Sequence, residues 1–233
     1  MDGRKIKGII FDFNGTMFFD EVFQKQSWIT FLENKTGRSI SETEFQEYVH
    51  GRNAEDTLSY FLQWELSREE VAALEEEKEV VYRRLCMECP EDFRLAEGLP
   101  RFLDELVRRG IPITIATASG WNNVRFFFGQ LHLDQWFDIN QVVYNDGTIP
   151  GKPEPDIYRR AAENININIE ECVVFEDAKS GIEAARRAGA GRIIGVASML
   201  EEEKLFAYGA EDTIKNYNNI DVSQWSPVTW NKK

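Results

Sequence analysis

The chain has 233 residues, of which 42% are hydrophobic, and its formal net charge is -13. A chain of this length buries enough apolar surface for an α/β core with a smaller appended module. The negative charge argues against nucleic-acid binding, which needs clustered Lys and Arg, and against attachment to anionic lipid headgroups. No apolar stretch approaches the length of a membrane span, and the first residues do not resemble a signal peptide. The three Cys residues are too few for a disulfide framework, so we expect a cytoplasmic protein.

Short apolar runs without alternation predict buried strands that are covered on both faces, as in a parallel sheet. Helical apolar stripes separate several of these runs, and the alternation is regular from about residue 92 onward. This order predicts an α/β fold with a Rossmann-like, doubly wound parallel sheet. The predicted strands are 7–12, 112–117, 141–144, 172–176 and 192–197, and the helical stripes lie at 99–107, 157–162 and 182–188.

Residues 20–90 interrupt that alternation, because they contain several helical stripes and no convincing strand. We therefore predict an inserted α-helical cap domain at 20–90 and a catalytic core formed by 1–19 and 91–233. The hinges between them would lie near 18–21 and 90–93. Near the C-terminus, Trp225, Pro227 and Trp230 would either pack on the core or belong to a loosely ordered tail.

Chemically useful side chains follow several of the predicted strands. Asp12 follows the first, Thr117 the second, and Glu176 and Asp177 another, while Lys152 precedes a helix. The carboxyl ends of parallel strands meet at one edge of the sheet, where active sites form. There a carboxylate can attack phosphorus, Mg²⁺ can bind oxygen ligands, and a Lys or hydroxyl can stabilise phosphoryl oxygens. The pattern therefore predicts phosphoryl transfer with Asp12 as the nucleophile.

Four motifs together resemble the haloacid dehalogenase-like superfamily, and specifically its β-phosphoglucomutase-like subgroup with a helical cap. They are Phe-Asp-Phe-Asn-Gly-Thr at 11–16, Ile-Ala-Thr-Ala-Ser at 115–119, Gly-Lys-Pro-Glu-Pro at 151–155 and Val-Phe-Glu-Asp-Ala-Lys-Ser-Gly-Ile-Glu-Ala-Ala at 174–185. The resemblance covers essentially the whole chain, and the last motif is the most specific.

The resemblance implies a site for Mg²⁺ and for a small phosphorylated substrate. Asp12, the backbone carbonyl of Asn14, and Asp177 would bind the metal, with Glu176 on or near it. Thr117 and Lys152 would bind the phosphate, and Lys152 would also shield the charge of Asp12. Further substrate contacts are expected from Thr16, Ala118 and Ser119 in the core and from the cap loop residues His50, Gly51 and Arg52.

Asn14 departs from the family pattern, which has a second Asp as general acid and base at this position. An amide cannot exchange protons near neutral pH, and general acid–base catalysis is typically worth ~10²–10⁴ in rate. Three interpretations stay open. In the first, the leaving group needs little protonation or receives its proton from Glu47 or His50. In the second, the chain is an engineered Asp-to-Asn variant, and in the third it binds phosphorylated ligands without turnover.

We therefore predict a Mg²⁺-dependent phosphatase that acts on a small phosphorylated metabolite, either sugar-phosphate-like or a pyrophosphate or acyl phosphate. The alternatives are a β-phosphoglucomutase-type phosphomutase and a low-activity phosphate-ligand binder. Gln24 and Ala54 weaken the mutase interpretation, because sugar phosphomutases of the subgroup have a His and an Arg there. No nucleic acid or membrane partner is expected, and no sequence feature sets an oligomeric state.

Overall fold

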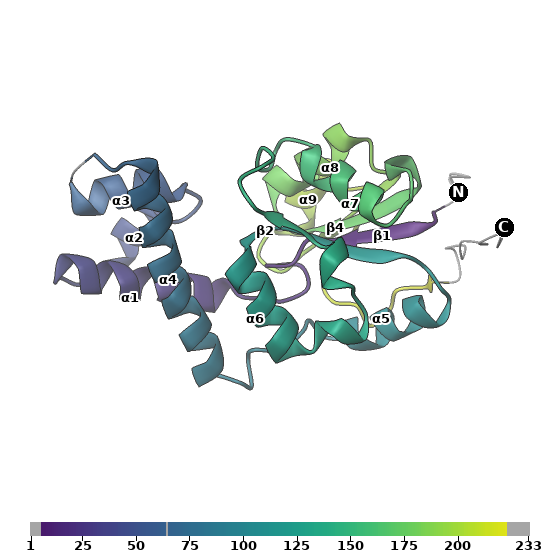
Figure 1. Cartoon of the computed structure of the whole chain (residues 1–233), viewed down its shortest axis with the longest axis horizontal. Helices are drawn as coiled ribbons and strands as arrows, with labels where there is room; N and C mark the ends of the chain where they lie inside the picture. The colour runs from purple at the N-terminus through teal and green to yellow at the C-terminus, as the bar shows by residue number, and fades with distance from the viewer. Residues whose placement is uncertain (1–5, 64, 223–233) are drawn as a thin grey trace. The chain divides into compact units, whose positions relative to one another are not determined.

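A computed structural model describes residues 6–63 and 65–222, and Figure 1 shows its course. The chain divides into two compact units. Met1–Phe19 and Arg94–Lys233 form one, which contains the sheet, and Asp20–Phe93 form the other, which is helical. None of the helices within the described residues is long and apolar enough to cross a membrane.

Within the described residues the sheet has six strands in the order β3-β2-β1-β4-β5-β6, and all neighbouring strands are parallel. Because β1 lies between β2 and β4, residues at the carboxyl ends of these three strands are neighbours. The strands are β1 (Gly8–Phe11), β2 (Ile113–Gly120), β3 (Val143–Asn145), β4 (Cys172–Glu176), β5 (Arg192–Val196) and β6 (Asp212–Ile214).

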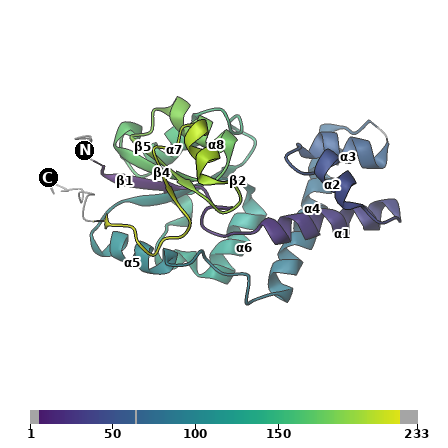
Figure 2. The same ribbon diagram turned by 180° about the vertical axis from the view of Figure 1, so that it is seen from behind.

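Helices cover both faces of the sheet, as Figures 1 and 2 show. On one face lie α7 (Asp156–Asn164), α8 (Lys179–Ala188) and α9 (Glu202–Tyr208), and on the other lie α5 (Leu99–Arg108) and α6 (Trp121–Leu131). Covered strands must be apolar on both sides, which explains why every residue of β1 and β4 is buried. The α7–α9 side packs small and branched residues such as Ala161, Ile182 and Ala185, whereas the α5 side packs aromatic rings.

The helical unit has its own apolar core and contains α1 (Glu21–Thr36), α2 (Glu42–Tyr48), α3 (Ala54–Leu62) and α4 (Arg68–Glu88). Side chains cap three of these helices, with Ser41, Asn53 and Ser67 each accepting a hydrogen bond from the backbone of the first turn. A buried polar network also joins α1 to α4. Lys78 donates to Gln24 Oε1 at 2.6 Å, and Tyr82 donates to Asp20 at 2.7 Å.

The predicted fold class is confirmed, since a parallel six-stranded sheet carries a helical insert between β1 and β2. Two details differ from expectation. Strand β2 continues through Gly120 instead of ending at Thr117, because Gly120 still pairs with Asn145 beyond a register irregularity. Strand β6 was not predicted, because it is only three residues long and partly polar. Trp225, Pro227 and Trp230 lie outside the described residues.

Candidate active site

Asp12 lies directly after the central strand β1 and is only 6% exposed. Its backbone N–H continues the sheet by donating to Phe175 at 3.0 Å, which fixes where the side chain begins. The ammonium of Lys152 lies 2.5 Å from Asp12 Oδ1 and 2.6 Å from Glu176 Oε1. The Lys152 ammonium thus joins the carboxylate that follows β1 to the carboxylate that ends β4, in a part of the sheet edge that is nearly closed to water.

The loop after Asp12 is held from inside the core. The Phe13 ring stacks on Phe127 of α6, with 4.3 Å between the ring centroids. The Phe13 carbonyl accepts a hydrogen bond from Met17 at 2.8 Å, and Gly15 donates to the carbonyl of Phe18 at 2.7 Å. These contacts close a tight turn immediately beyond the nucleophile candidate, so its carboxylate rests on a well-defined backbone.

Asp177 lies against this turn. Gly15 has a φ of 75°, and a Cβ there would fall 2.2 Å from Asp177 Oδ2, so both its backbone angle and its lack of a side chain are required. Thr16 donates its hydroxyl proton to Asp177 Oδ1 at 3.1 Å. The turn that follows β1 therefore packs closely against Asp177, which follows β4.

Glu176 is the most enclosed carboxylate of the group, with 1% of its surface exposed. Besides Lys152, its Oε1 accepts a hydrogen bond from the Tyr158 hydroxyl at 3.0 Å, and its Oε2 accepts one from the Ala178 N–H at 2.8 Å. A Cβ on Gly181 would fall 1.6 Å from Glu176 Oε1. The first turn of α8 thus leaves room for this carboxylate, which orients Lys152 toward Asp12.

Oxygen atoms of Asp12, Glu176 and Asp177 lie within 4.8 Å of one another, close enough to hold one metal ion. The arrangement is electrostatically costly by itself. Burial, and then the charges of Glu176 and Asp12, raise the pKa of Asp177 well above its usual value. A hard divalent cation would relieve this repulsion, and carboxylate oxygens are the ligands that Mg²⁺ prefers. The residues present therefore fit the metal that the sequence predicts.

Lys152 keeps its charge in this environment. Burial alone would lower the pKa of the Lys152 ammonium, but the charges of Asp12 and Glu176 outweigh it and raise the pKa well above the usual value. Tyr158 is also protonated at neutral pH, because burial and then the Glu176 charge raise the pKa of its hydroxyl. The site thus offers one permanent cation beside two carboxylates.

The end of β2 approaches the same turn from the other side of β1. Thr117 is buried, and its Oγ1 accepts a hydrogen bond from the Ser119 N–H at 3.1 Å. The Ser119 hydroxyl donates to Asn14 Oδ1 at 2.8 Å, while the intervening Ala118 is exposed. The structure therefore brings Thr117, Ser119 and Asn14 together, and the Asn14 amide has its carbonyl oxygen turned to a hydroxyl donor.

The sequence did not identify Tyr217 as part of this region. Tyr217 is 1% exposed, packs on Phe102 and Phe175 at centroid distances of 5.7 and 5.6 Å, and donates to the Thr16 carbonyl at 3.1 Å. Its hydrogen bond to Thr16 therefore helps to hold the turn after Asp12 in place. Tyr158 was recognised only as a member of an apolar helical stripe. No sequence signal marks either hydroxyl, because each partner is distant along the chain.

His50, Gly51 and Arg52 lie in the connection between α2 and α3 of the helical unit, and all are exposed. Gly51 has a φ of 72°, as a tight connection requires, and Arg52 Nε donates to the Glu47 carbonyl at 3.3 Å. Asn53 caps α3 through its contact with Asp56 N at 2.8 Å. The role of these cap residues in substrate binding stays a prediction.

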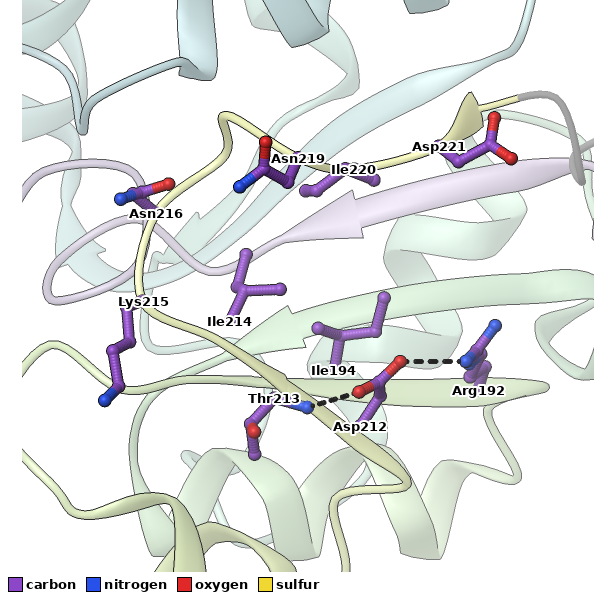
Figure 3. A pocket seen from close by; sticks show the side chains of 10 residues that line it. All are labelled: Arg192, Ile194, Asp212, Thr213, Ile214, Lys215, Asn216, Asn219, Ile220 and Asp221. Carbon is purple, nitrogen blue, oxygen red and sulfur yellow. Dashed lines mark hydrogen bonds and ion pairs between the residues drawn. The ribbon is translucent and has the colours of Figure 1, made fainter.

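A hollow beside β5 and the edge strand β6 contains none of the predicted site residues. Figure 3 shows that it is lined from β5, β6 and the segment that follows β6, with an ion pair of 3.0 Å between Arg192 and Asp212 on one wall. Its strands are separated from β1 by β4. We therefore place the candidate active site at the carboxyl ends of β1, β2 and β4 and not in this hollow.

Comparisons with known proteins show which family the chain resembles. Residues 6–189 match the family model for haloacid dehalogenase-like hydrolases. The chain is 34% identical, over 148 residues, to a phosphorylated carbohydrates phosphatase of Thermotoga maritima; the match covers 63% of this chain and 64% of that protein, less than two thirds of its length. A crystal structure of a HAD hydrolase of family IA, variant 3, from Entamoeba histolytica superposes with a TM-score of 0.88 and 37% identity, covering 94% of this chain and 97% of that one. A β-phosphoglucomutase structure from Clostridium difficile gives a TM-score of 0.72 with 25% identity, covering 93% of each chain.

Proposed function

Since the chain belongs to the haloacid dehalogenase-like hydrolase family, we propose that it is a phosphatase that hydrolyses small phosphorylated metabolites through a phosphoaspartate on Asp12. The observation that carries the proposal is the buried contact of Asp12 with Lys152, within reach of Asp177. A carboxylate nucleophile divides one difficult displacement into two easier ones. The similarity to a phosphorylated carbohydrates phosphatase supports a phosphorylated carbohydrate as the substrate class.

In the first step an Asp12 oxygen attacks phosphorus, the bond from phosphorus to the leaving oxygen breaks, and the leaving group departs with the electron pair. Lys152 compensates the charge of Asp12 and donates to a phosphoryl oxygen. Thr117 accepts the Ser119 N–H, so its own hydroxyl proton can point toward the phosphate. In the second step water attacks the phosphoaspartate, which releases inorganic phosphate and regenerates Asp12.

Mg²⁺ would be held by Asp12, Asp177 and the backbone carbonyl of Asn14, with Glu176 beside it. When bound, it supplies positive charge that offsets the crowded carboxylates and the incoming phosphate. Glu176 contributes by orienting Lys152. Its two carboxylate oxygens are already occupied as acceptors, because they receive hydrogen bonds from Lys152, from the Tyr158 hydroxyl and from a backbone N–H.

Asn14 decides which phosphates can be hydrolysed fast. Its amide cannot deliver the proton that an alkoxide leaving group needs, so leaving groups of low pKa, as in acyl phosphates and pyrophosphate, are favoured unless Glu47 or His50 of the helical unit supplies the proton. The same substitution supports a second candidate, a phosphate-ligand binder of low turnover. A phosphomutase is less well supported, because the Gln24 amide is already bound by Asp20 and Lys78.

The test measures inorganic phosphate released, with and without Mg²⁺, from sugar phosphates, glycerol 1-phosphate, pyrophosphate and acetyl phosphate. We expect Mg²⁺-dependent release that Asp12→Asn abolishes. The matched control is Asp134→Asn, since this residue lies on the surface in the turn after α6. Mg²⁺-dependent binding without release by the unaltered chain would favour the binder, and release that survives in Asp12→Asn would exclude Asp12 as the nucleophile.

A further inference from the structure

An aromatic pair at the active-site edge of the sheet consists of exposed Trp121 and half-buried Tyr144. Trp121 begins α6 directly after β2, and 39% of its surface is exposed. Its ring lies 5.0 Å from that of Tyr144 in β3, with an interplanar angle of 34°. The indole thus packs against its neighbour and still leaves apolar surface exposed.

The pair lies beside the segment that contacts Asn14, two residues beyond Asp12 in the chain. Trp121 is two residues beyond Ser119, whose hydroxyl contacts Asn14, so its Cα lies within about 8 Å of the Ser119 Cα. Tyr144 precedes Asn145, which pairs with Gly120 in the sheet. The carboxylates Glu176 and Asp177 lie at the end of β4, on the other side of β1. From Asp12, the charged part of the site and the aromatic pair therefore lie in opposite directions.

The segment that joins Thr117 to this pair carries no charge, since it reads Ala118-Ser119-Gly120. It is therefore suited to the uncharged organic part of a substrate and not to a second phosphate group. An aromatic face binds flat, weakly polar surfaces, such as the C–H face of a sugar ring or an aromatic ring. An acyclic chain offers no such surface.

Resting on the proposed phosphatase function, we propose that Trp121, supported by Tyr144, is a specificity-determining residue that packs against a ring in the leaving group. It selects ring-bearing phosphate monoesters over acyclic ones. Sugar rings and aromatic rings share this recognition chemistry, and the assay below separates them.

The experiment compares kcat/KM for glucose 6-phosphate, phenyl phosphate and glycerol 1-phosphate in the unaltered chain and in Trp121→Ala. We expect the ratio of ring-bearing to acyclic substrate to fall about fivefold to tenfold. Trp121→Phe keeps a ring and should restore at least half of the preference. The control Phe206→Ala removes an aromatic side chain that is 48% exposed on α9, and it should leave the ratio unchanged. A ratio that is the same in Trp121→Ala and the unaltered chain overturns the inference.

The ring-bearing substrate whose kcat/KM falls more in Trp121→Ala shows which kind of ring Trp121 contacts, a sugar ring or an aromatic ring. If the unaltered chain hydrolyses none of the three, the proposed function fails separately, and calorimetric binding of the same phosphates with Mg²⁺ then decides the inference. Weaker binding of ring-bearing phosphates alone in Trp121→Ala supports it. Equal losses for all three, or no loss, contradict it.

Discussion

Replacing Lys152 with Met removes the ammonium group between Asp12 and Glu176 while keeping an apolar side chain of similar length. Only 8% of the Lys152 side chain is exposed, and its two carboxylate partners lie at 2.5 and 2.6 Å. Removing one partner of a buried ion pair costs about 3–5 kcal/mol, because the remaining charge is left buried and unpaired. In a domain of this size each kcal/mol lowers the melting temperature by about 2–4 °C. We therefore expect Lys152→Met to melt about 6–20 °C below the unaltered chain at pH 7.5 without Mg²⁺.

The measurement is thermal unfolding followed by circular dichroism over a pH series. Burial and the charges of Glu176 and Asp12 raise the pKa of Asp177 in the folded state, and the Lys152 charge opposes this rise, so Lys152→Met should raise it further. The deficit should therefore shrink as the pH is lowered through the folded-state pKa of Asp177, because protonation then removes its buried charge.

The matched control is Lys215→Met, whose ammonium contacts Glu202 at 3.1 Å with 72% of its side chain exposed. Such a surface pair is worth at most about 1 kcal/mol, so this variant should melt within about 4 °C of the unaltered chain. If Lys152→Met melted no lower than Lys215→Met at pH 7.5, the buried charge pair would not be the stabilising feature described here.

Three further predictions concern the same site. Asn14→Asp should raise kcat for alkyl phosphates by ~10²–10⁴, because it supplies a general acid, and equal high activity in both chains would contradict this. Mg²⁺ at about 100 times its dissociation constant should add about 2.7 kcal/mol of stability, or about 5–11 °C in the melting temperature. Because the pKa of Asp177 is raised, the metal must displace a proton at low pH; the Mg²⁺ shift should therefore grow as the pH rises, and Asp177→Asn should abolish it. Tyr217→Phe removes the hydrogen bond to the Thr16 carbonyl and should lower the melting temperature by about 1–6 °C, so an unchanged value would count against its positioning role.

Most of the core fold follows from the sequence, because strands buried on both faces leave a continuous apolar signal. Strands β1, β4 and β5 lie within a residue or two of where the apolar runs predict them. The edge strand β6 could not be predicted in this way, since only three of its residues pair and the first of them, Asp212, is exposed. The extension of β2 through Gly120 could not be predicted from apolar runs either, because the pairing of Gly120 with Asn145 depends on a register shift and not on hydrophobicity.

The candidate site follows from the sequence where it depends on strand ends. Asp12 and Asp177 each directly follow a strand and Thr117 lies in the second half of one, and parallel topology brings such positions to one edge. Lys152 is different, because it lies seven positions beyond the last residue of β3 and only the resemblance indicated its partner. Tyr158 and Tyr217 could not be predicted at all. Their rings read as ordinary core residues, and only the folded structure shows which acceptor each hydroxyl reaches.

The charge balance of the site explains how Asn14 can favour binding and oppose turnover together. Asp12, Glu176, Asp177 and Lys152, when all are ionised, leave two net negative charges, which one divalent cation would neutralise before a phosphate dianion arrives. A fourth carboxylate at position 14 would restore a negative charge beside the substrate. The amide avoids that repulsion and still accepts the Ser119 hydroxyl at 2.8 Å, but it gives up the proton transfer. The chain with Asn14 should therefore bind phosphate esters more tightly, and hydrolyse them to inorganic phosphate more slowly, than its Asn14→Asp variant.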